Sequence, residues 1–137
     1  MKKITVIISA LLVLLASAVY AATTLTVYES AQSGIATTHS HAAAGTLCSF
    51  TNSGREIILA RNDNVSTTVT LTVTATGTRA GLALTSETIT VAPSSEVVAG
   101  GFSSEIFNSA TGTVEFRVTG TTVTLTVVKP RGAWGNE

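Results

Sequence analysis

The segment Thr67–Thr76, TTVTLTVTAT, constrains the fold more than any other part of this 137-residue chain. Its apolar residues and threonines alternate strictly, which places Val69, Leu71 and Val73 on one face and the threonines on the other. Valine and threonine are both β-branched and fit a pleated strand better than a helix. The segment is therefore predicted to be a half-buried β-strand with one face against a core.

Similar short runs, separated by turn signals, follow one another from Cys48 to Val128. Their regular spacing is typical of an antiparallel sandwich or small barrel. We therefore predict an all-β fold, a single antiparallel β-sandwich of jelly-roll or immunoglobulin-like type with about seven strands. The expected strand segments are Arg55–Asn62, Thr67–Thr76, Leu82–Val91, 96–102, 103–107, Thr113–Val118 and Thr122–Val128.

The apolar faces of these segments define the expected core. Fully burying one such side chain contributes ~1.5–3 kcal/mol, so the set is adequate for one domain. The predicted core residues are Ile57, Leu59, Val69, Leu71, Val73, Leu82, Leu84, Ile89, Val91, Val98, Phe102, Ile106, Phe107, Val114, Phe116, Val123, Leu125 and Val127.

The opposite faces of two strands carry threonine where a solvent-facing strand usually carries Lys and Glu. These residues are Thr70, Thr72, Thr74, Thr122, Thr124 and Thr126. Uncharged threonine does not repel a second copy as edge lysines do. The faces are therefore expected to be either ordinary polar surface or contacts between subunits.

Residues 1–21 are predicted to be a cleaved signal peptide. Lys2 and Lys3 precede an apolar run that ends with Val19 and Ala21 at the positions that a signal peptidase reads. The alternative is a retained membrane anchor, although a run of roughly 16 to 19 apolar residues is short for a spanning helix. The expected location is secreted, extracellular or at the cell surface, with no stable membrane span after cleavage.

Cleavage would also change the charge of the chain. Of eight basic residues, Lys2 and Lys3 leave with the signal, so six face the eight acidic residues and the net charge becomes −2. No basic patch is available for a phosphate backbone, and we therefore expect no nucleic-acid partner.

Residues 22–46 are predicted to form one extended strand, near Thr23–Tyr28, and a flexible tether before the domain at 47–129 and a tail at 130–137. The strand could fold onto its own domain as an edge strand. It could also be donated to a neighbouring subunit, with Leu25 and Val27 inserted on the core side and Thr23 and Tyr28 completing the donor strand. Seventeen tether residues span up to ~55 Å, which permits donation, and head-to-tail donation does not close but gives a filament.

The sequence offers little for catalysis. The only histidines, His39 and His41, lie in the tether, and the carboxylates are scattered singly. The chain has no glycine-rich phosphate loop, nucleophile elbow or paired-cysteine zinc motif, so we expect neither an enzyme nor a cofactor.

Two weaker candidate sites remain. On an extended segment, His39 and His41 point the same way and could hold copper or zinc with Cys48 as a third ligand. The alternative is a solvated or interface-packed polar segment, with the single Cys48 buried as a small apolar residue. Asn64 opens the triplet NVS, which fits an N-glycosylation acceptor in an exported chain.

The order of NSGREIILARN, TVTLTV, VAP, GGF, FN, GTVEFRV and VTLTVV resembles the small β-sandwich proteins that decorate the capsids of tailed phages, also called head-associated proteins. The resemblance covers about Asn52 to Val128. Its motif residues are Asn52, Gly54, Arg55, Val91–Pro93, Gly101, Phe102, Phe107 and Asn108. It implies a sandwich fold and assembly on repetitive surfaces, whereas the signal peptide departs from a family that assembles in the cytoplasm.

Together these features predict an exported structural protein whose partner is itself. It would be a subunit of an extracellular filament or surface assembly, a homopolymer built by β-strand donation between subunits. The alternatives are a phage-type capsid decoration protein and a surface adhesive or metal-binding β module.

Overall fold

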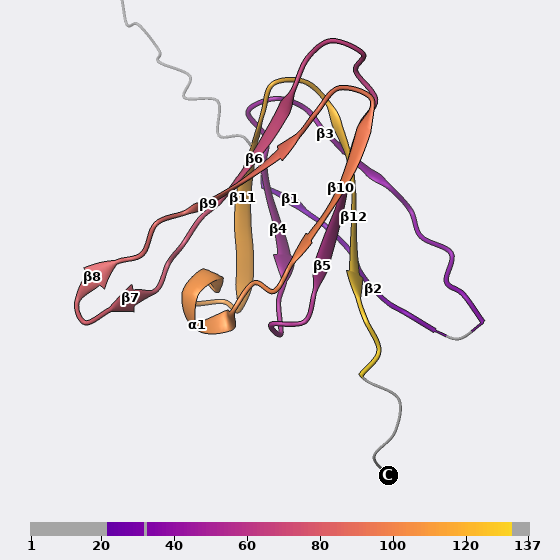
Figure 1. Ribbon diagram of the computed structural model, residues 1–137. Helices are drawn as coiled ribbons and strands as arrows, with labels where there is room; N and C mark the ends of the chain where they lie inside the picture. Colours follow the sequence, from indigo (N-terminus) through magenta and orange to yellow (C-terminus); the bar gives the residue numbers. More distant parts are fainter. Residues whose placement is uncertain (1–21, 32, 133–137) are drawn as a thin grey trace, which may run out of the picture.

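A computed structural model describes residues 22–31 and 33–132 (Figure 1). The predicted signal peptide and residues 133–137 of the predicted tail lie outside this range. Within it, no helix is both long and apolar enough to cross a membrane. The elements are β1 (Thr23–Thr24), β2 (Val27–Glu29), β3 (Ser40–Ala42), β4 (Leu47–Thr51), β5 (Ile57–Asn62), β6 (Val69–Val73), β7 (Thr78–Arg79), β8 (Leu82–Ala83), β9 (Glu87–Val91), β10 (Ser95–Gly100), α1 (Ser104–Phe107), β11 (Thr113–Thr119) and β12 (Val123–Lys129).

The fold is all-β, as predicted, and contains two mixed sheets. The first has the order β1-β4-β11-β6-β9, and the second has the order β10-β5-β12-β2 with β3 also paired to β12. A separate two-stranded pair, β7 and β8, lies at the end of an arm that projects from the rest of the molecule (Figure 1). The segment 103–107, expected to be extended, contains the four-residue helix α1 instead.

The expectation of purely antiparallel sheets was wrong at two edges. β1 pairs parallel with β4, and β2 pairs parallel with β12. The chain passes from the first sheet to the second between β1 and β2, so one continuous segment lies along the edge strand of each sheet. A third strand, β3, pairs antiparallel with β12 inside the stretch predicted to be tether.

Buried side chains from both sheets form one hydrophobic cluster. The rings of Phe102 lie 6.0 Å from Phe50 and 5.9 Å from Phe107, both in edge-on geometry, and Phe116 lies 6.3 Å from Phe50. Such aromatic pairs add to the free energy gained by burial alone. The predicted core residues that are buried are Val69, Leu71, Val73, Ile89, Val91, Phe102, Phe107, Val114, Phe116, Val123, Leu125 and Val127.

The predicted phase of β5 was wrong. Ile58 and Ala60 are buried, whereas Ile57 and Leu59 lie half-buried on the opposite face. The sequence IILA is apolar on both faces, so alternation alone does not choose between them. Asn62 decides the phase because its side chain is fully buried.

The buried amide of Asn62 joins the loop between β5 and β6 to the turn between β9 and β10. Its Nδ2 donates to the carbonyl oxygens of Thr67, Val91 and Ala92 at 2.8, 3.2 and 3.2 Å, and its Oδ1 accepts from the backbone N–H of Asn64 at 3.1 Å. A buried amide without such partners would destabilise the fold by about 1–3 kcal/mol. These hydrogen bonds therefore fix which residues of β5 face the core.

Several other predicted core residues lie outside the core. Leu82 is 73% exposed because it lies in the projecting β7–β8 pair, and Val98 is 61% exposed because it points outward from β10. Leu84 is half-exposed, and Ile106 is only partly buried against the cluster. β4 contributes two fully buried residues: Cys48, whose burial as a small apolar residue was one of the predicted interpretations, and Phe50, which was not predicted.

The loop before β5 is built around a buried carboxylate, Glu56. It accepts hydrogen bonds from the Ser53 N–H at 2.6 Å, the Ser53 hydroxyl at 2.8 Å and the Arg55 N–H at 3.1 Å. Burial by itself would raise the pKa of Glu56, but hydrogen bonds from Ser53 and from backbone N–H groups outweigh it and lower the pKa below its ordinary value.

We expect Ile58→Ala to lower the free energy of unfolding by about 2–5 kcal/mol, because a cavity is left in a closely packed core. Leu59→Ala, one residue away on the half-buried face, should lower it by about 1 kcal/mol. Urea unfolding followed by circular dichroism measures both. The reverse order of the two values would contradict the phase of β5 described above.

We expect Glu56→Gln to make the free energy of unfolding less dependent on pH in the acidic range. The folded-state pKa of Glu56 is below the unfolded one, so the carboxylate stabilises the fold above the unfolded pKa, and that contribution is lost as pH falls through the folded pKa. The free energy of unfolding of the unmodified protein should therefore fall more steeply below about pH 5 than that of the variant. Glu96→Gln removes an exposed carboxylate and is the matched control; equal slopes in all three proteins would contradict the assignment.

Candidate functional site

The most distinctive site is the flank where the segment Ala22–Ser30 crosses from one sheet to the other. Thr23 and Thr24 are in register with Cys48 and Ser49 of β4, and the Leu25 N–H donates to the Ser49 carbonyl at 2.7 Å. Leu25 is only 4% exposed and belongs to the core cluster. This one side chain therefore fills the space between the sheets at this flank.

Beyond Leu25 the segment continues along the second sheet. Val27, Tyr28 and Glu29 are in register with Val127, Val128 and Lys129 of β12, and Val27 packs against the core cluster. The Ser30 N–H donates to the Lys129 carbonyl at 3.0 Å. All four residues of the predicted donor strand thus lie against their own domain, with Thr23, Val27 and Tyr28 half-buried and Leu25 buried.

The contacts that hold the segment are few, and sequence reasoning missed its partners. The Tyr28 hydroxyl accepts from the Thr38 N–H at 3.0 Å, and hydrogen bonding with Thr38, through its side chain first and its backbone second, lowers the pKa of Tyr28. Glu29 and Lys129 form an ion pair at 3.5 Å, of a surface type that contributes little. The ion pair depends on the register of β2 with β12, for which the local sequence gives no signal.

The tether is shorter than predicted. Because β3 is bound to β12, the connection from the end of β2 to the start of β3 consists only of residues 30–39. Ten residues span at most ~33 Å, compared with ~55 Å for the seventeen residues expected. Any neighbour that receives this segment must therefore be in direct contact with the donor subunit.

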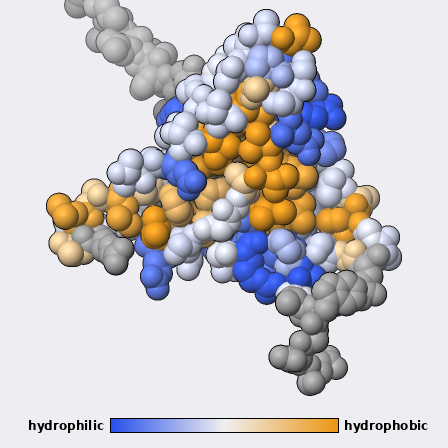
Figure 2. All heavy atoms as spheres, in the orientation of Figure 1, coloured by the Kyte–Doolittle hydropathy of each residue, from blue (hydrophilic) through white to orange (hydrophobic). Residues whose placement is uncertain are grey.

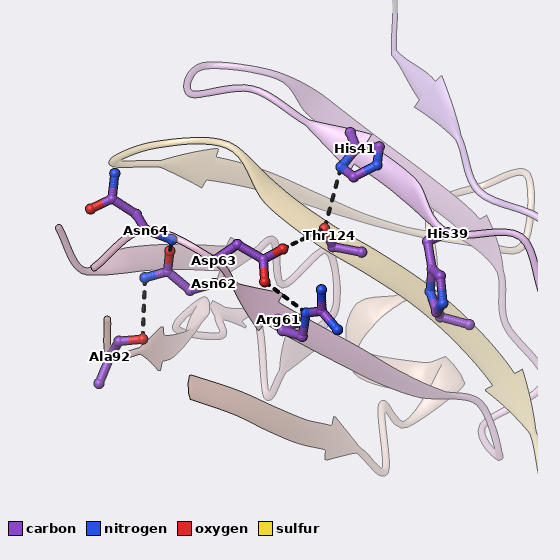
Figure 3. A network of polar contacts seen from close by, with 9 residues as sticks. His39, His41, Arg61, Asn62, Asp63, Asn64, Ala92 and Thr124 are labelled. Atoms are coloured by element: carbon purple, nitrogen blue, oxygen red, sulfur yellow. Dashed lines mark hydrogen bonds and ion pairs between the residues drawn. The ribbon is translucent and has the colours of Figure 1, made fainter. Parts of the chain in front are cut away.

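The two histidines lie on the outer side of β12, in the polar network of Figure 3. The His41 Nδ1 lies 3.3 Å from the Thr124 hydroxyl, which also donates to Asp63 at 3.3 Å, and Asp63 pairs with Arg61 at 2.8 Å. His39 hydrogen-bonds instead to Thr126. Each ring thus has a different threonine partner on the same strand.

Cys48 does not join these histidines. It is fully buried in β4, in the first sheet, whereas both histidines lie against the second. Burial raises the pKa of the Cys48 thiol to about 11. Among the residues that the structure describes, no group of three His, Cys, Asp or Glu side chains is placed to hold a metal ion. The arrangement thus offers no complete ligand set for copper or zinc.

Asn64 lies in the loop between β5 and β6. Its Oδ1 accepts from the N–H groups of Ser66 and Thr67 at 2.9 and 2.7 Å. Its Nδ2, the atom that would carry a glycan, points away from the neighbouring residues in Figure 3. The hydrogen bonds to Oδ1 thus orient the Asn64 side chain so that Nδ2 points outward.

Most motif residues of the phage-like resemblance lie at one end of the molecule, whereas Val91–Pro93 lies at the opposite end, beside Asn62. The Asn52 Nδ2 donates to the Phe102 carbonyl at 2.8 Å and to the Asn108 Oδ1 at 2.7 Å, and the Asn108 Nδ2 donates back to the Asn52 carbonyl at 3.0 Å. Gly54, with a φ of 88°, donates to the Asn52 Oδ1. These residues have a structural role here, fastening the loop before β5 to the turn after α1.

Searches with this chain against protein-family models, curated proteins and solved structures gave no match. The crossing segment and the sheet edges are therefore the features from which a function can be inferred.

We expect the Cys48 thiol to resist labelling in the folded protein. With a pKa of about 11 instead of 9.0, its thiolate fraction at neutral pH falls about 100-fold, and burial limits access further. Reaction with an aromatic disulfide reagent, followed by absorbance with and without urea, measures the effect. Equal rates in both conditions would contradict the placement of Cys48 in the core.

Proposed function

We propose that the protein is an exported structural subunit of an extracellular filament or surface assembly. In that assembly, the segment Ala22–Ser30 of each copy occupies the groove between the sheets of the next copy. One observation carries this proposal: the segment closes the groove through edge pairing and a single buried side chain, Leu25, and is joined to the domain only by a ten-residue connection.

Exchange of the segment between copies replaces its contacts with identical ones. Every contact that it makes with its own β4 and β12 is available, in identical form, on another copy. Main-chain pairing supplies most of these contacts, and Leu25 supplies the buried anchor, as in other cases of strand addition to a sheet edge. The difference between the two arrangements therefore lies in the connection and in the concentration of subunits.

The short connection sets the conditions for exchange. A short flexible linker gives its own segment an effective concentration in the millimolar range, so closure within one chain prevails in dilute solution. Donation prevails where subunits are crowded, or where a further contact holds them together. Export to a surface, which the predicted signal peptide at 1–21 supports, would supply such crowding.

The proposal includes a finer view of the fold. The two mixed sheets form a single β-sandwich of jelly-roll or immunoglobulin-like type, with the crossing segment as the exchangeable strand. The protein has no catalytic role in this view. Its threonine-rich outer faces carry neither the lysines nor the net charge that would keep copies apart.

The native cysteine offers a direct test of donation. Thr23 is in register with Cys48 on the adjacent strand, so a cysteine at position 23 lies within reach of the native thiol. We expect Thr23→Cys, refolded at high concentration in a thiol redox buffer, to give a ladder of disulfide-linked multimers on a non-reducing denaturing gel. Negative-stain microscopy of the same sample should show filaments.

Thr24→Cys is the matched control, because position 24 is in register with Ser49 and its side chain points to the other face. It should give no ladder while leaving the filaments intact. If Thr23→Cys instead gives only a monomer with an internal disulfide at every concentration, the segment stays within its own chain and the proposal fails.

A further inference from the structure

The flank opposite the crossing segment is open. β9 and β10 are the last strands of their sheets, and each is paired on one side only among the described strands. They follow one another in the chain, so both free edges border the same flank. Figure 2 shows hydrophobic side chains gathered between these two strands, where no further segment covers them.

The free edge of β10 lacks the usual protection against pairing. Edge strands are normally guarded by lysine, proline, a bulge or an inward-pointing charge. β10 reads SEVVAG, has an unbroken register with β5 from Ser95 to Gly100, and carries one charge, Glu96, which is exposed. An unbroken edge of six residues with a single charge is a template for another strand.

The apolar residues of β10 are also incompletely covered. Val97 and Ala99 pack against the core cluster but are only partly buried, while Val98 on the outer face is 61% exposed. Both faces of the strand would therefore gain from a neighbouring strand. Removing apolar surface from water would stabilise such a contact by about 25 cal/mol per Å².

We propose that β10 pairs antiparallel with β10 of a second copy, around a two-fold axis at Val98. In this register Val98 lies opposite Val98 of the second copy, Val97 opposite Ala99, and Glu96 opposite Gly100. No like charges face each other directly, and the exposed valines cover one another on the outer face. A register centred on Val97 would instead place the Glu96 carboxylate opposite Val98, which leaves the valine uncovered.

This contact goes beyond the proposed strand donation and does not require it. A two-fold contact closes on itself, so it joins two copies and no more. Between free subunits it gives a dimer, and between subunits of two filaments it gives lateral pairing. The partner that fits this edge is thus a second copy of the same chain.

Cross-linking tests both the contact and its register. Residues directly opposite one another in an antiparallel pair have Cα atoms about 4.5–5.5 Å apart, within the range that a disulfide bridges. We expect Val98→Cys to give a disulfide-linked dimer on mild oxidation, and exposure of this side chain makes the substitution compatible with folding. Circular dichroism before oxidation verifies the fold.

Glu96→Cys is the matched control, on the same strand and the same face. Its counterpart in the second copy lies four residue steps away, ~13 Å along the strand, which is too far for a disulfide. We expect at least about tenfold less dimer than with Val98→Cys. Equal dimer from both variants, or none from Val98→Cys across concentrations, would overturn the proposal.

The result with Val98→Cys can be interpreted independently of the result with Thr23→Cys. A ladder from Thr23→Cys without a dimer from Val98→Cys overturns the β10 contact alone. A dimer from Val98→Cys without the ladder overturns donation alone and leaves the β10 contact supported.

Discussion

The structure depends on whether the main-chain groups at the four outer edges of its two sheets are paired. Main-chain N–H and C=O groups at an edge must find partners or face water. At one flank the segment Ala22–Ser30 supplies those partners to both sheets in turn, and Leu25 completes the core between them. At the other flank β9 and β10 receive no such cover. In the proposed function, this asymmetry is the basis of the contacts between copies.

Buried polar residues hold the edges in place. Asn62 joins β5 to the loops that lead to β6 and β10, and Asn52 with Asn108 joins the loop before β5 to the turn before β11. In a low-dielectric interior such bonds are stronger than in water, and their loss leaves unpaired groups. They therefore help to fix the register of the strands and loops that they join.

The sequence predicted those strands whose buried face is determined by their own residues. β6, β11 and β12 alternate along their own length, so their buried faces could be read directly. The phase of β5 could not, because IILA is apolar on both faces and the choice depends on Asn62, whose partners come from distant loops. The parallel direction of β1 and β2 is likewise set by β4 and β12, far along the chain. The candidate metal set failed to assemble for the same reason: proximity of His39, His41 and Cys48 in sequence does not place them on one sheet.

The short connection links the two proposals physically. With ten residues between the crossing segment and β3, a donated strand reaches only a subunit already in contact, so donation by itself starts slowly from separate monomers. A β10 contact supplies proximity between copies without using the donor groove, and it leaves both grooves free. Head-to-tail donation extends the assembly without closing, and the two-fold β10 contact joins copies in pairs. Together the two contacts suffice for an assembly of paired filaments. Under the proposed function, the donor groove is protected by its own segment before assembly, because the filled groove leaves no unpaired β4 or β12 edge at that flank.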